Sequence, residues 1–87
     1  MISRVTPAFW RCLYTLTPSQ QEAATWAYET FMKDPGHPSL RFKKLAGEED
    51  VWSVRVSLDL RAVAHRQGDT VTWFWIGTHK EFDRLFG

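Results

Sequence analysis

Three strand-like runs decide the fold of this chain: Val-Trp-Ser-Val-Arg-Val at 51–56, Leu-Arg-Ala-Val-Ala-His at 60–65 and Trp-Phe-Trp-Ile-Gly-Thr-His at 73–79. The runs are rich in β-branched and aromatic residues and are joined by turn residues, which is typical of strands. Arg55 and Arg61 lie inside two of them. Because an unpaired arginine is costly to bury, the runs predict a sheet with one polar face. Such a face, with His79 at its rim, is suited to holding phosphate groups.

The turn between the last two runs sets their register. Residues 67–70 (Gln-Gly-Asp-Thr) have the composition of a hairpin with a two-residue turn and with Gly68 at positive φ. Side chains alternate across a sheet, so the turn decides which of them share a face. The predicted facing pairs are Gln67 with Thr70, His65 with Thr72, Val63 with Phe74, and Arg61 with Ile76.

The preceding turn can be read in two ways. A three-residue loop at 57–59 places Arg55 opposite Arg61, whereas a two-residue loop puts them on opposite faces and buries one of them. We prefer the three-residue loop because it keeps both faces consistent. The core face then carries Trp52, Val54, Val56, Ala62, Ala64, Trp73 and Trp75. The polar face carries Ser53, Arg55, Arg61, Val63, His65, Thr72 and Phe74.

Two arginines facing each other on adjacent strands repel unless an anion or an acid lies between them. A bound phosphate satisfies both, because the guanidinium fork matches phosphate oxygens. The alternative is a solvated sheet face on which each arginine pairs with a nearby carboxylate. The pair Arg55 and Arg61 is therefore a candidate phosphate site.

Cap residues predict two helices before the sheet. Thr6, followed by proline, starts the first helix. Thr17 with Gln20 three residues later forms a capping box for a second helix over 18–33, and the proline-rich residues 34–38 end it.

After the helices the hydrophobic period changes to two, as expected for strands. Strands are predicted at 39–45 and at about 51–57, 60–66 and 71–76. We expect Gly77 to break the last strand and residues 80–86 to form a short tail helix. The predicted fold class is α+β, with two N-terminal helices packed on a mainly antiparallel four-stranded sheet and a short C-terminal helix.

Length and composition indicate a single domain over residues 1–87. No apolar run approaches the roughly 18 residues of a membrane span. Cys12 is the only cysteine, which predicts no internal disulfide and fits a reducing, cytoplasmic setting. The three histidines lack cysteines or carboxylates at ligand spacing, so no metal site is predicted. A net charge of +1 means that any basic site must come from spatial sorting of charges.

Four segments together resemble the RelE/ParE toxin superfamily, and most closely its RelE-like cytotoxic translational repressor branch. They are residues 35–45 (Pro-Gly-His-Pro-Ser-Leu-Arg-Phe-Lys-Lys-Leu), 52–56 (Trp-Ser-Val-Arg-Val), 60–62 (Leu-Arg-Ala) and 75–79 (Trp-Ile-Gly-Thr-His). The resemblance extends over about residues 4–86. It implies an antiparallel sheet packed against two N-terminal helices.

The resemblance also implies an activity, a type II toxin that cleaves mRNA in the ribosomal A site without metal or other cofactor. A ribose 2′-hydroxyl attacks the adjacent phosphorus, which leaves a cyclic phosphate and a free 5′-hydroxyl. By position, Arg55 and Arg61 would stabilise the developing charge, and His79 would act as acid or charge stabiliser. Further RNA contacts would come from Lys43, Lys44, Arg41 and His65. The implied partners are the ribosome, mRNA and a cognate antitoxin, a helical segment of which would lie across the helices or a sheet edge.

Two other functions remain open within the same superfamily. One is a ParE-like inhibitor of DNA gyrase that does not cut RNA, and the other is an inactive member that only binds its antitoxin. Phe82 stands where the family commonly has a tyrosine, and Ser53 where more active relatives tend to have a lysine. The oligomeric state does not follow from the sequence.

Overall fold

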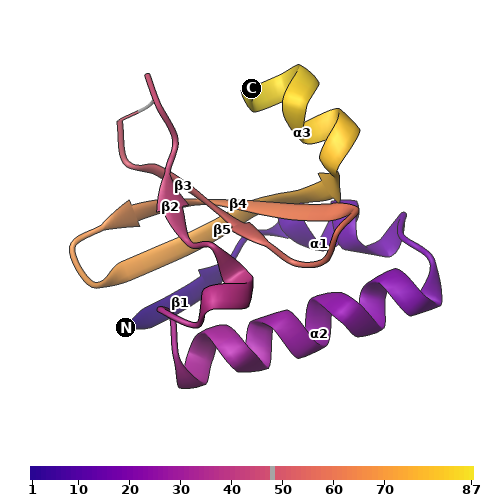
Figure 1. The fold of residues 1–87 in the computed structure, drawn as a ribbon, viewed down its shortest axis with the longest axis horizontal. Helices are drawn as coiled ribbons and strands as arrows, with labels where there is room; N and C mark the ends of the chain where they lie inside the picture. Colours follow the sequence, from indigo (N-terminus) through magenta and orange to yellow (C-terminus); the bar gives the residue numbers. More distant parts are fainter. Residues whose placement is uncertain (48) are drawn as a thin grey trace.

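The computed structural model describes residues 1–47 and 49–87, which form a five-stranded sheet with helices on both faces (Figure 1). The elements in chain order are β1 (Ile2–Val5), α1 (Pro7–Tyr14), α2 (Pro18–Lys33), the 3₁₀ helix η1 (Pro38–Leu40), β2 (Lys43–Lys44), β3 (Val51–Arg55), β4 (Leu60–Gln67), β5 (Thr70–Thr78) and α3 (His79–Phe86). The α+β class is confirmed. No helix in the described part of the chain is long and apolar enough to cross a membrane.

Strand order in the sheet is β1-β5-β4-β3-β2, with β1 parallel to β5 and every other neighbouring pair antiparallel. The expectation of four strands missed β1. Ser3 secures this strand, because its hydroxyl accepts hydrogen bonds from the Tyr28 hydroxyl at 3.0 Å and from Nε1 of Trp73 at 3.1 Å. The first strand of the chain therefore depends on partners from α2 and β5.

Both N-terminal helices begin where their caps predict. The Thr6 side chain accepts from the Phe9 amide, and Thr17 and Gln20 form the complete capping box. These helices pack on one face of the sheet, with α3 on the other (Figure 1). The buried core beneath α1 and α2 consists of Ala27, Phe31, Leu40, Val54, Val56, Leu60, Ala62, Ala64, Val71, Trp73 and Ile76.

The predicted strand at 39–45 is wrong over most of its length. Pro38–Leu40 is a 3₁₀ helix capped by the His37 side chain, which accepts from the Ser39 amide, and only Lys43–Lys44 pairs as a strand. Arg41 adopts the left-handed conformation, with φ 46° and ψ 47°, which interrupts an extended strand. Leu40 is 1% exposed, so its burial as an anchor decides this local geometry over the period-two pattern.

The predicted register is confirmed next to both turns that join β3, β4 and β5. In the β4–β5 hairpin it is wrong from Val63 to the end that lies away from the turn. Arg55 faces Arg61, Gln67 faces Thr70, and Gly68 has φ 59°. An irregularity between Val63 and Ala64 shifts the remaining pairs. Val63 therefore faces Trp75, Ala62 faces Ile76 and Arg61 faces Gly77.

Because of this bulge, Trp75 leaves the predicted core face and joins the face that carries the arginines. Its indole packs against Phe86 of α3, with ring centroids 5.3 Å apart. Gly77 does not break the strand but makes room for this ring, since a Cβ there would lie 2.5 Å from Cζ2 of Trp75. The expected break at Gly77 is wrong for this steric reason.

A second apolar cluster forms under α3 on the face that was expected to be polar. It contains Leu45, Val51 and Val63 as buried residues, with Phe74, Trp75, Phe82 and Phe86 packed against them. The helix thus covers part of that face. What stays open and polar is the end of the sheet where Arg55 and Arg61 lie.

Candidate functional site

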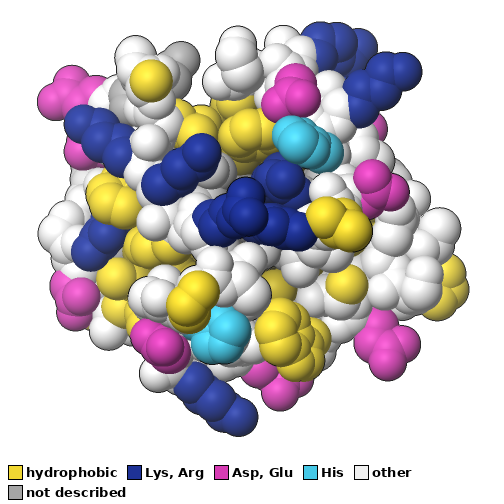
Figure 2. All heavy atoms as spheres, viewed as in Figure 1, with side chains coloured by type: hydrophobic (Ala, Val, Ile, Leu, Met, Phe, Trp, Pro, Cys, Tyr) yellow, Lys and Arg dark blue, Asp and Glu magenta, His cyan; other side chains and the backbone are white. Residues whose placement is uncertain are grey.

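A hollow of about 280 Å³ opens on the arginine-bearing face beside α3. It is lined by Arg41, Lys43, Ser53, Arg55, Arg61, His79, Phe82 and Asp83. Figure 2 shows lysine and arginine side chains gathered over the middle of this face, with a histidine near them. The hollow brings together five of the seven residues predicted from sequence.

Residues far apart in the sequence reach the hollow because of the sheet register. Facing positions on β3 and β4 carry Arg55 and Arg61, and Lys43 on β2 faces Ser53. His79 is the first residue of α3, whose start is capped by the Thr78 hydroxyl accepting from the Glu81 amide. The cap therefore fixes where the histidine leaves the sheet.

Arg61 is anchored at one end of its guanidinium group. Its Nη1 donates to the carbonyl oxygens of Ser57 at 2.8 Å, Leu60 at 2.9 Å and Leu58 at 3.3 Å. Its Nη2 lies 3.4 Å from Nδ1 of His79. These contacts hold the guanidinium in one place. They use only some of its five N–H donors, so the others stay available to an anion in the hollow.

Burial and the neighbouring charges both act on the pKa of Arg61. Partial burial lowers the pKa of Arg61, the positive charges of Arg55 and Arg41 lower it further, and Asp83 acts in the opposite direction. The group remains cationic at neutral pH because arginine starts from so high a pKa. Besides burial, two neighbouring cations and a single carboxylate act on this group, so the charges around it are mainly positive.

Four cationic side chains and one carboxylate line the hollow. Within residues 1–47 and 49–87, neither Arg55 nor Arg61 forms an ion pair with a carboxylate. The alternative of a solvated face with each arginine paired therefore does not describe this structure. An incoming anion would relieve the repulsion between the two facing arginines.

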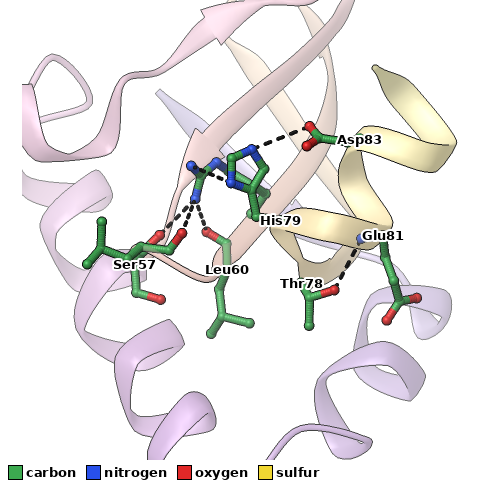
Figure 3. A network of polar contacts seen from close by, with 8 residues as sticks. Ser57, Leu60, Thr78, His79, Glu81 and Asp83 are labelled. Carbon is green, nitrogen blue, oxygen red and sulfur yellow. Dashed lines mark hydrogen bonds and ion pairs between the residues drawn. The ribbon is translucent and has the colours of Figure 1, made fainter.

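His79 lies between groups of opposite charge. Its Nδ1 points to Arg61, and its Nε2 lies 3.4 Å from Oδ1 of Asp83, one helical turn further along α3 (Figure 3). Asp83 was missed in the sequence analysis. The signal that could have found it is the spacing of four residues from His79, which places both side chains on one side of a helix.

Two predicted RNA-binding residues lie outside the hollow. Lys44 faces Trp52 across β2 and β3, so it shares the other side of the sheet. His65 lies four residues from Arg61 along β4, about 13 Å away at strand spacing. Its ring stacks on Phe74, with centroids 4.6 Å apart. A role for either residue in RNA binding stays a prediction.

The chemistry of the hollow suits an anion and not a metal ion. Its lining is mainly cationic, and the described residues include no group of three histidine, cysteine or acidic side chains placed to hold a metal. The fold and the site together define a class of small α+β domains with a mainly cationic hollow on one sheet face.

The chain belongs to the ParE-like toxin domain family, whose model matches residues 18–84, and thus to the RelE/ParE superfamily. No curated protein sequence matches it significantly.

Solved structures share the fold at low sequence identity. The RelB–RelE antitoxin–toxin complex from Methanococcus jannaschii matches with a TM-score of 0.76 and 15% identity, over 97% of this chain and 99% of that chain. YafQ from E. coli matches with a TM-score of 0.72 and 11% identity, over 98% and 97%. The RelBE2 toxin–antitoxin complex from Mycobacterium tuberculosis matches with a TM-score of 0.68 and 22% identity, over 90% and 96%.

Proposed function

We propose that this chain is the toxin of a type II toxin–antitoxin system and that it cleaves mRNA in the ribosomal A site without a metal ion. The observation that carries the proposal is the facing pair Arg55 and Arg61, which has no carboxylate partner among the described residues and lies in a hollow with His79. A phosphodiester is the anion of an RNA chain, and guanidinium groups bind its oxygens in a fork.

The hollow supplies the fixed cations and the proton-exchanging group that internal RNA cleavage needs. As the ribose 2′-oxygen attacks phosphorus, negative charge builds up on the phosphate oxygens, and fixed cations close to those oxygens lower the barrier. Arg61 is held by the turn carbonyls before substrate arrives, so little reorganisation is required of it. His79 can exchange a proton with the reacting hydroxyl groups.

Induced expression of the chain is expected to arrest growth and to yield transcripts cut at defined positions with 5′-hydroxyl ends. The measurement is mapping of 5′ ends in total RNA, with His79→Ala expected to reduce the cuts strongly. Arg11→Ala is the matched control, because Arg11 is an exposed cation on α1 outside the hollow. Uncut transcripts in arrested cells expressing the unmodified chain would contradict the proposal.

A second candidate function is inhibition of DNA gyrase without RNA cleavage. The observation in its favour is Phe82, which lines the hollow with a ring that carries no hydroxyl group for proton transfer. The same expression experiment separates the two functions. Induction of DNA-damage signalling with intact mRNA supports gyrase, whereas cut mRNA without that signal supports cleavage.

The proposed partner is an antitoxin helix that docks on α1 and α2. Trp10 is 44% exposed and lines a groove of about 230 Å³ between the two helices, and Tyr14, which is 70% exposed, stacks on the Trp10 ring. Exposed aromatic side chains beside a groove suit the apolar face of an amphipathic helix.

Trp10→Ala is expected to weaken binding of the protein encoded beside this gene at least tenfold, because truncated aromatic anchors commonly cost about 2 kcal/mol or more. Co-purification followed by titration calorimetry measures the effect. Leu58→Ala is the control, since Leu58 is 78% exposed at the β3–β4 turn, away from the groove. Equal affinities of Trp10→Ala and the unmodified chain would place the antitoxin elsewhere.

A further inference from the structure

The two neighbours of His79 select the same imidazole tautomer. Arginine has only donors, so Nδ1 must offer its lone pair to Nη2 of Arg61, 3.4 Å away. An ionised carboxylate has only acceptors, so a proton on Nε2 is favoured by Oδ1 of Asp83, also 3.4 Å away. Of the two neutral tautomers, both contacts therefore favour the one that carries its hydrogen on Nε2 and turns the Nδ1 lone pair toward Arg61 (Figure 3).

The helix holds Asp83 in this position. The Thr78 cap fixes the start of α3, and the rings of Phe82 and Phe86 pack on Trp75 at centroid distances of 6.4 and 5.3 Å. Because α3 is anchored in this way, the carboxylate of Asp83, its fifth residue, stays close to the imidazole of His79, its first residue.

Among the described residues that line the hollow, Asp83 also differs in charge from the four cationic side chains. Arg61 comes from β4, Arg55 from β3, and Arg41 and Lys43 from the segment before β3, and all four are cations lining the same hollow. In that environment a protonated imidazole is opposed by each of them. Of the described residues in the lining, Asp83 alone carries a carboxylate that can offset this repulsion.

We propose that Asp83 is a positioning residue, which directs Nδ1 of His79 into the hollow and stabilises the imidazolium once Nδ1 has taken up a proton. The proposal rests on the proposed RNA cleavage. In that reaction the 2′-oxygen bonds to phosphorus while the bond from phosphorus to the 5′-oxygen breaks. The 2′-hydroxyl takes the place of Nη2 of Arg61 at the Nδ1 lone pair and transfers its proton there. The 5′-oxygen leaves with the bonding electron pair and takes a proton from water. The imidazolium then returns its proton to solvent.

This role predicts that loss of the Asp83 charge slows RNA cleavage but does not weaken RNA binding. Loss of the Asp83 charge removes the partner of the imidazolium, so the chemical step slows. The same change makes the hollow more positive, so RNA binding does not weaken. A carboxylate that only supported the folded helix would not produce this separation.

The kinetic test compares Asp83→Asn with Glu81→Gln in single-turnover cleavage of mRNA held in the ribosomal A site. Glu81 is the matched control because it lies on the same helix, carries the same charge and pairs with Arg84, outside the hollow. We expect Asp83→Asn to lower the saturating rate at least tenfold without raising the half-saturating toxin concentration, and Glu81→Gln to change neither. Adding Asp83→Asn to His79→Ala should slow cleavage no further. A rate within twofold of the unmodified chain, or additive losses in the double variant, would overturn the proposal.

A measurement on the free protein keeps the inference independent of cleavage. The ¹⁵N shifts of the neutral His79 ring report the tautomer, and we expect the Nε2–H form to predominate and to lose that predominance in Asp83→Ala. Predominance of the Nδ1–H form in the unmodified chain, or no change in Asp83→Ala, would overturn the positioning role. If the unmodified chain leaves RNA intact, the proposed cleavage fails, and the tautomer result still decides whether Asp83 orients His79.

Discussion

Arg61→Ala is expected to lower the rate of RNA cleavage by about 10²- to 10³-fold, the range found when a preorganised donor to a developing negative charge is removed. Arg61 faces Arg55 across β3 and β4, and Nη2 lies next to His79. Its loss removes the cation that the structure holds most firmly in the hollow. Single-turnover cleavage on programmed ribosomes measures the effect.

The anchoring of Arg61 means that this variant also needs a measurement of stability. Nη1 satisfies carbonyl oxygens of the β3–β4 turn, so Arg61→Ala should cost about 1–3 kcal/mol in the free energy of unfolding. Arg61→Lys keeps the charge but not the fork, and we expect it to cleave at least about tenfold more slowly than the unmodified chain.

Arg66→Ala is the control for charge on the same strand. Arg66 lies over the Trp52 ring at 4.5 Å, which places it on the opposite side of the sheet from Arg61. Its cleavage rate should match that of the unmodified chain. Full activity of a folded Arg61→Ala protein would contradict the assignment of this arginine to the reaction.

Phe31→Ala is expected to lower the free energy of unfolding by about 3–5 kcal/mol, as for other large aromatic residues truncated in a core. Phe31 is 2% exposed and packs edge-on against Phe42 and Trp73 at centroid distances of 5.0 and 5.2 Å. Because domains of this size are stabilised by about 5–15 kcal/mol in total, the loss is a large fraction of the whole. Urea denaturation measures it.

Tyr14→Ala is the matched control for aromatic truncation, since Tyr14 is 70% exposed at the end of α1. Its free energy of unfolding should change by no more than about 0.5 kcal/mol. Similar losses for the two variants would show that α2 does not hold the sheet through Phe31.

The features that could be predicted from sequence depend on neighbours along the chain. Thr6, Thr17 and Gln20 mark the helix starts correctly because a cap is built from residues within three or four positions of each other. The facing of Arg55 and Arg61 was predicted correctly because only a three-residue turn keeps both faces of the sheet consistent, and a short turn fixes the register of the strands it joins.

The features that could not be predicted depend on contacts between distant segments. β1, at the start of the chain, pairs with β5, near its end. The bulge in the last hairpin moves Trp75 to the face where its ring packs on Phe86 of α3. The left-handed Arg41 lies between the buried anchor Leu40 and the short strand β2.

The same division applies to the candidate site. The α+β class, the helix starts and the opposed arginines follow from local features of the sequence, because alternation, capping and turn length act over a few residues. Packing between distant segments places α3 over part of the arginine face, leaves Lys44 and His65 outside the hollow, and brings Asp83 into it. Those outcomes arise from the packing of aromatic rings brought together from different elements, which no local pattern encodes.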